Sequence, residues 1–117
     1  MPAVSLTEKL SQVTAHWHPH VVAAYNGNDI MVVKVEGDFT WHSHPDTDDF
    51  FMVLKGRILI DLPDETVTLE AGELFVVPAG VEHRPRAPHG EAHLLIIEPA
   101  GTPNTGDPDT AVSKPAI

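Results

Sequence analysis

Apolar and polar residues alternate along this chain in short runs, which is the pattern of β-strands. Residues 57–62 show it most clearly, because Ile58, Ile60 and Leu62 fall on one face. Turn-forming Gly, Pro, Asn and Asp residues separate the runs, so that strands recur about every 8–12 residues. The pattern predicts strands over residues 21–25, 30–36, 50–55, 57–62, 66–69, 74–77, 81–86 and 91–98. Such a series is typical of an all-β sandwich or barrel.

The two ends of the chain lack this β pattern. Residues 1–15 carry one weak helical signal, with Ser5 or Thr7 as the capping residue. Residues 99–117 are polar, contain four prolines and show almost no apolar periodicity. We therefore expect an N-terminal arm with a short helix at 1–15, a barrel domain at 16–98 and an extended, partly disordered C-terminal tail at 99–117.

Composition limits the classes of protein to consider. The chain has 117 residues, of which 42 % are apolar and 21 % charged, and these values predict one globular domain. Its 17 acidic and 7 basic residues give a net charge of −10, which argues against a nucleic-acid partner. No apolar run approaches the ~18 residues of a membrane span. With no secretory signal visible and no cysteine, we expect a cytoplasmic protein without membrane contact.

Histidine is abundant, with eight residues, and one group of histidines has a spacing that suits a metal site. His42 and His44 lie two positions apart, so on a strand both imidazoles project from one face. Asp49 can bring a carboxylate beside them, and His83 begins a later β segment. Three imidazoles and a carboxylate suit zinc, iron, manganese, nickel or copper rather than calcium. The alternative interpretation is a solvated strand end beside an acidic turn.

Glycines and a proline surround these histidines with spacings that resemble the two motifs of the cupin superfamily. The first motif is matched by Gly37, His42-Ser43-His44, Asp49 and Gly56. The second is matched by Gly72, Pro78-Ala79-Gly80 and His83, with Ala87 where the family has Asn. The resemblance covers residues 30–98.

The resemblance implies a double-stranded β-helix, a small jelly-roll barrel that holds one divalent metal ion (Zn, Fe, Mn or Ni) in its mouth. By position, the implied ligands are His42, His44, Asp49 and His83. Asp49 stands where the family has Glu, and the side chain is one methylene shorter, or ~1.5 Å. Asp49 can therefore ligate directly, ligate through water, or leave a site of three histidines.

Other polar residues have simpler interpretations. His16, His18 and His20 alternate around Pro19 and suit the surface of an edge strand. His93 either points into the barrel as an acid or base, or lies exposed near a loop. Residues on the opposite face from His83, expected at the rim and paired with acidic groups, are Arg84 and Arg86. Residues expected in the core or pocket wall are Phe39, Trp41, Phe50, Phe51, Met52 and Phe75.

Two functions fit this inventory. The first is a metal-dependent enzyme of isomerase, dioxygenase or lyase type that acts on a small molecule. The second is a non-catalytic cupin module that binds a small molecule or a metal ion. We also expect a homodimer, as small cupins commonly form, because the open edge at residues 16–25 leaves backbone groups unpaired.

Overall fold

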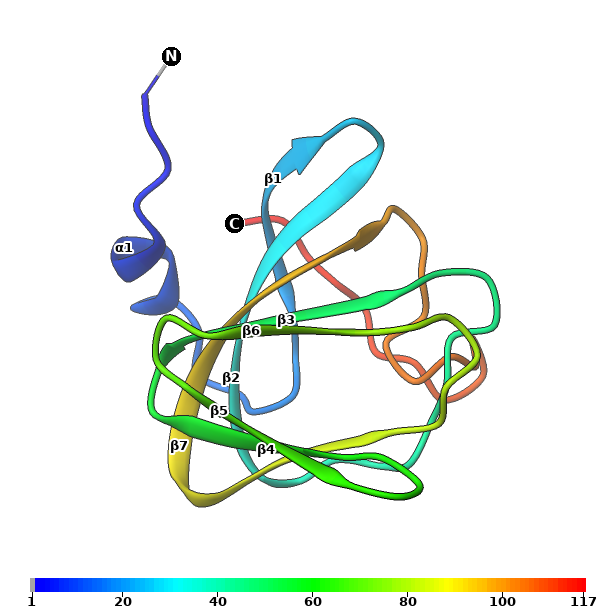
Figure 1. Cartoon of the computed structure of the whole chain (residues 1–117). Coiled ribbons are helices and arrows are strands. Elements are labelled where there is room, and N and C mark those ends of the chain that lie inside the picture. The colour runs from blue at the N-terminus through cyan, green and yellow to red at the C-terminus, as the bar shows by residue number, and fades with distance from the viewer. Residues whose placement is uncertain (1) are drawn as a thin grey trace.

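The computed structural model describes residues 2–117, which form one short helix and seven strands (Figure 1). The elements are α1 (Leu6–Leu10), β1 (His20–Tyr25), β2 (Asn28–Asp38), β3 (Asp49–Lys55), β4 (Arg57–Asp61), β5 (Thr66–Glu70), β6 (Leu74–Val77) and β7 (Arg84–Pro99). The predicted all-β class and the short N-terminal helix are confirmed. Ser5 caps that helix, and its side chain accepts the N–H of Glu8.

The strands pair antiparallel in the order β1-β2-β7-β3-β6, and the β4–β5 hairpin joins the first residues of β7. The predicted strands 81–86 and 91–98 are parts of one element, because β7 is continuous across the expected loop at 88–90. The loop survives as a bulge: the pairing to β2 jumps from Ala92 opposite Val35 to Ala87 opposite Gly37. One strand therefore contacts β2, β3 and β4.

The core lies between the facing strands of this curved sheet. Val35, Val53, Ile58, Ile60 and Leu94 are all buried there, as the alternation of their strands predicts. A smaller apolar cluster, which includes Leu10, Val13 and Val32, packs α1 against the other face of β2. The main core fills the barrel interior, and His83 packs against it through Phe51.

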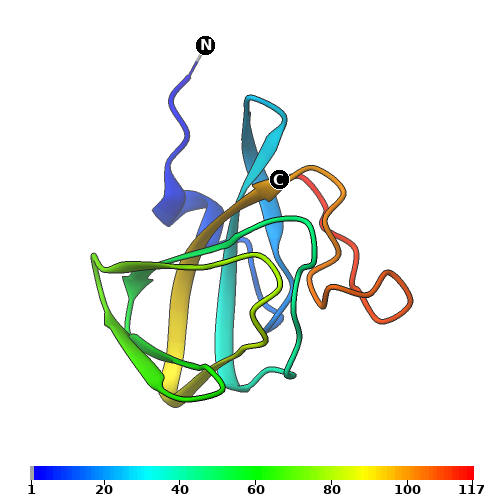
Figure 2. The same ribbon diagram turned by 45° about the vertical axis from the view of Figure 1, so that its right-hand side comes forward.

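The end of the chain does not extend away from the barrel. After β7, residues 100–117, which we call the C-terminal strap, fold back along the side of the barrel and return to β1 (Figures 1 and 2). The N–H of Val21 donates to the carbonyl of Pro115 at 2.9 Å, and the N–H of Ile117 donates to that of Val21 at 3.0 Å. The strap is the C-terminal tail expected from the sequence, and in the structure its last residues pack against β1.

This packing changes the expectation for the edge at 16–25. The strap occupies the outer side of β1 at Val21, so part of the edge proposed for dimer contact is already paired within the chain. The positive φ of Trp17, +62°, also breaks the alternation that would place His16, His18 and His20 on one face. The expectation of a homodimer is untested and stays a prediction.

Candidate metal centre

Three separate segments place the four expected residues. His42 and His44 lie in the connection between β2 and β3, Asp49 is the first residue of β3, and His83 directly precedes β7. The prediction that the two histidines lie on a regular strand is wrong, because only His42 forms an isolated bridge. In that bridge the backbones of His42 and His83 exchange two hydrogen bonds, of 3.0 and 2.9 Å, and so hold the segments together.

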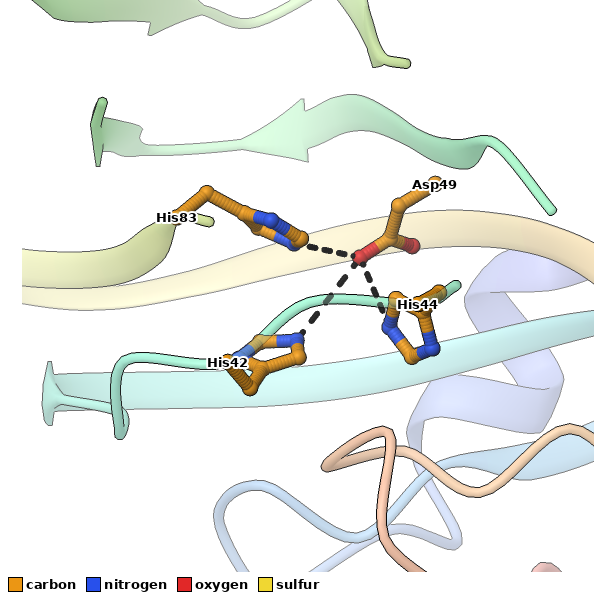
Figure 3. A group of neighbouring side chains, drawn as sticks. All are labelled: His42, His44, Asp49 and His83. Atoms are coloured by element: carbon orange, nitrogen blue, oxygen red, sulfur yellow. Dashed lines mark hydrogen bonds and ion pairs between the residues drawn. The ribbon is translucent and has the colours of Figure 1, made fainter. Parts of the chain in front are cut away.

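The four side chains meet around one oxygen atom (Figure 3). From Asp49 Oδ2 the distances to Nε2 are 2.8 Å for His83, 3.2 Å for His44 and 3.8 Å for His42. All four residues are buried, and one potential ligand atom from each lies within 4.8 Å of the others. Donor atoms about 2.0–2.2 Å from a common ion stand roughly 3 Å apart, so this spacing suits one metal ion.

Backbone carbonyls orient two of the imidazoles. The Nδ1–H groups of His42 and His83 donate to the carbonyls of Thr40 and Val81, each at 2.9 Å. Nε2 is therefore the nitrogen of each ring that faces Asp49, and it is the atom through which these histidines could bind a metal ion. His44 differs, because its buried Nδ1 has no partner among the described residues. The carbonyl two residues before it, that of His42, already accepts the N–H of His83.

The electrostatics of the cluster favour a cation. Burial would raise the pKa of Asp49, but hydrogen bonds from His42, His44 and His83 outweigh it and hold this pKa well below its usual range. Burial lowers the pKa of His44, and the hydrogen bond and charge of Asp49 outweigh that and raise it. The cluster is thus a buried carboxylate among three imidazoles, and the residues present fit a first-row divalent ion.

A largely apolar pocket opens beside the cluster. His42, His44 and Asp49 line one part of it. The apolar walls are formed by Trp17, Pro19, Val33, Val35, Phe39, Phe51, Pro85, Leu94 and Ile96. The rings of Trp17 and Phe39 are stacked with centroids 4.9 Å apart. The remaining polar residues in the lining are Glu98 and Asn104.

Several pocket residues were outside the sequence predictions. Glu98 continues the inward face of Leu94 and Ile96, so strand alternation contains a signal for it. Burial raises the pKa of Glu98 in spite of its ion pair with Lys114. Trp17 and Asn104 lie far from the motifs in sequence, and no spacing links them to the site.

Other predicted residues lie elsewhere. His93 does not reach the cluster: its Nε2 lies 2.9 Å from Glu91 Oε1, and Glu91 also contacts His16 at 2.8 Å. Trp41 is 43 % exposed and lies beside the Arg84 guanidinium, so it is neither core nor pocket wall. Phe51 and Phe39 do line the pocket, as expected.

The arginines beside His83 pair with an acidic group, as expected. Arg84 and Arg86 both donate to Asp61, at 2.8 Å for the shortest contact of each.

Known proteins share this architecture. Residues 29–98 match the model of the cupin domain. A crystallised cupin-2 domain containing protein from Shewanella frigidimarina is 44 % identical, with a TM-score of 0.81 over 83 % of this chain and 94 % of that one. The uncharacterized protein YdbB of Bacillus subtilis is 34 % identical over 66 % of this chain and 77 % of its own length.

A second group of relatives carries a named activity. The 3-hydroxyanthranilate 3,4-dioxygenase of Brucella anthropi is 32 % identical over 71 % of this chain. The match covers 54 % of that enzyme, so the chain spans about half of its length.

Proposed function

Because this chain belongs to the cupin family, we propose that it binds one divalent transition metal ion through His42, His44, Asp49 and His83 and acts on a small molecule. The observation that carries this proposal is the convergence of three imidazole Nε2 atoms and Asp49 Oδ2 at the wall of an apolar pocket. Iron is our first candidate for the ion, since imidazole and carboxylate ligands suit it and dioxygenases are among the relatives.

The protein contributes orientation, exclusion of water and charge. The backbone carbonyls of Thr40 and Val81 fix two imidazole rings, so these ligands are preorganised before an ion arrives. The apolar walls exclude water from a small molecule bound beside the cluster. A bound transition ion would supply Lewis acidity and, for a redox-active metal, electron transfer.

The pocket favours a ring-sized, mostly apolar substrate, and we propose an oxygenase-type reaction. The aromatic faces of Trp17 and Phe39 and the aliphatic wall of β2 and β7 suit such a molecule. A sugar phosphate fits less well, because no arginine or lysine lies in the lining.

A non-catalytic metal-binding module is the second candidate. Four protein donors complete a tetrahedral zinc shell, which leaves no position for a substrate. The same four donors leave two positions open on a six-coordinate ion such as iron. With Asp49 as the fourth ligand, the identity of the metal therefore decides which of the two functions is possible.

Elemental analysis of protein purified without added metal tests the proposal first. We expect about one transition ion per chain, followed by oxygen uptake with catechols, hydroquinones or 3-hydroxyanthranilate that a chelator removes. One zinc ion per chain and no turnover would favour the binding module. A chain that takes up no transition ion at all would contradict the proposal.

The oligomeric state and the cellular location of this protein are also proposals. The described residues contain no helix long and apolar enough to cross a membrane. We keep the homodimer as a proposal, and light scattering at micromolar concentration tests it. A mass near 12.7 kDa that does not change on concentration would contradict a dimer.

A further inference from the structure

We propose that Asn104 of the C-terminal strap determines substrate specificity by donating a hydrogen bond to an uncharged acceptor group on a small, mostly apolar molecule. This inference deepens the proposed function by naming a feature of the substrate. It assigns to the strap a part of the binding site that lies outside residues 29–98, where the cupin domain matches.

The pocket offers few polar contacts besides the metal cluster. Apart from His42, His44 and Asp49, the polar residues that line the pocket are Glu98 and Asn104. Glu98 is buried and already forms an ion pair with Lys114. A second polar group on the substrate must therefore meet Asn104 or remain without a partner, which is unfavourable in an apolar pocket.

The orientation of the Asn104 side chain leaves its donor free. Its Oδ1 accepts the backbone N–H of Val112 at 3.0 Å, which fixes which side of the amide is oxygen. The Nδ2 group makes no hydrogen bond within residues 2–117. An amide held in this way presents two N–H donors, so its natural partner is an acceptor such as a carbonyl or nitro oxygen.

The strap is anchored tightly enough to position this donor. Lys114 contacts both Glu98 and the carbonyl of Thr102, and so joins the strap to the end of β7. Gly106 lies directly against the loop that carries His42 and His44, because a Cβ at this position would collide with the carbonyl oxygen of Ser43. Asn104 is thus held between two fixed points close to the metal cluster.

The charged groups near Asn104 argue for an uncharged acceptor. The pocket lining contains no arginine or lysine, and Lys114 is already paired with Glu98. A carboxylate on the substrate would therefore have no free cationic side chain at the strap end of the pocket. An uncharged oxygen acceptor needs only the Asn104 hydrogen bond.

The test compares two probes that differ in one acceptor group, 4-nitrotoluene and toluene. Calorimetric or NMR titration of the full chain, with and without added iron, measures the preference for the nitro probe. We expect the wild type to bind 4-nitrotoluene about fivefold more tightly than toluene, the size of one net hydrogen bond. Asn104→Asp should remove that preference, because it keeps the acceptor for Val112 and loses both donors.

Two controls keep the test decisive. Asn28→Asp makes the same chemical change in the β1–β2 turn, where the side chain contacts only local carbonyls, and should leave the preference intact. If Asn104→Asp fails to fold, Lys114→Met, which breaks the anchor, replaces it, with exposed Lys55→Met as its control. Loss of the preference in Lys114→Met alone supports the proposal.

Either of two results overturns it: a wild type that binds both probes equally, or an Asn104→Asp variant that keeps the preference. The metal content of the same samples reports separately on the proposed function. A chain that takes up none of the added iron but still prefers 4-nitrotoluene would reject the metal site and retain the role of Asn104.

Discussion

Two aspartates are buried in this barrel, and their partners differ in kind. Asp49 is 6 % exposed, and its Oδ2 contacts the Nε2 atoms of His42, His44 and His83. Asp61 is 7 % exposed and accepts hydrogen bonds from Arg84, Arg86 and Thr66. Both carboxylates are therefore largely removed from water, and each contacts three side chains.

The difference lies in whether the side chains around each aspartate can also bind a metal ion. A guanidinium stays charged at any ordinary pH and has no lone pair for a metal, so the group around Asp61 is complete as an ion-pair network. An imidazole can present a lone pair from Nε2, so a divalent ion can take the place of the protons around Asp49. The same carboxylate group is thus structural in one setting and, in our proposal, metal-binding in the other.

His44→Ala should produce the largest effect on this comparison. Removal of one imidazole from the shell should lower metal affinity more than about 100-fold, beyond what loss of an outer hydrogen-bond partner causes. Metal content after dialysis measures it. His93→Ala is the control, since that imidazole contacts Glu91 and lies outside the cluster. An unchanged metal content in His44→Ala would show that the cluster is not the site.

Asp61→Ala should affect stability and leave metal content unchanged. It leaves Arg84 and Arg86 without their shared partner, and we expect the free energy of unfolding to fall by about 2 kcal/mol. Chemical denaturation measures the change. Asp38→Ala removes an exposed carboxylate 3.7 Å from Arg84 and should cost less than about 0.5 kcal/mol. Equal losses in the two variants would contradict a structural role for Asp61.

Asp49→Glu tests how closely the carboxylate fits its backbone position. Asp49 Oδ2 already lies 2.8 Å from the nearest Nε2, so a side chain longer by ~1.5 Å should crowd the shell and weaken metal binding about tenfold. A competition assay with a coloured chelator measures the affinity, with the exposed Asp46→Glu as control. Equal or tighter binding would mean that the backbone leaves room for the longer family residue.

The smallest expected effect is a pH dependence of stability from Asp61. The hydrogen bond from Arg86, with help from Arg84, lowers the pKa of Asp61 to about 2. A lowered pKa stabilises the fold above the ordinary carboxyl pKa near 4, and this contribution is lost as the pH falls toward 2. Between about pH 4 and pH 2 the wild type should lose about 1 kcal/mol more than Asp61→Asn. Parallel unfolding curves for the two proteins across this range would contradict the assignment.

Local pattern accounts for much of the fold and of the metal cluster. Alternation in residues 57–62 and 66–69 predicts the β4–β5 hairpin, because each strand buries one face. The motif spacing selects His42, His44, Asp49 and His83, which the structure brings together. That agreement arises although the connection that carries His42 and His44 is irregular.

The remaining site residues depend on long-range packing that a single sequence does not encode locally. Trp17 reaches the pocket through a backbone bend at φ +62°, and a tryptophan carries no strong signal for that conformation. Asn104 lies in a polar, proline-rich segment that composition assigns to an extended, partly disordered tail. Neighbouring residues of the strap hold it in place. Gly106 lies against Ser43, Lys114 pairs with Glu98 and Ile117 bonds to Val21, at separations of 63, 16 and 96 residues along the chain.

The continuity of β7 sets an order for the assembly of this protein during synthesis. His83 directly precedes the strand and Glu98 is its penultimate residue, so the last of the four proposed metal ligands and the partner of Lys114 lie near the two ends of one element. Strands β2 and β3 have no central partner until β7 arrives between them. The proposed metal shell is therefore incomplete until His83 has been synthesised, and the strap packs against the barrel after that.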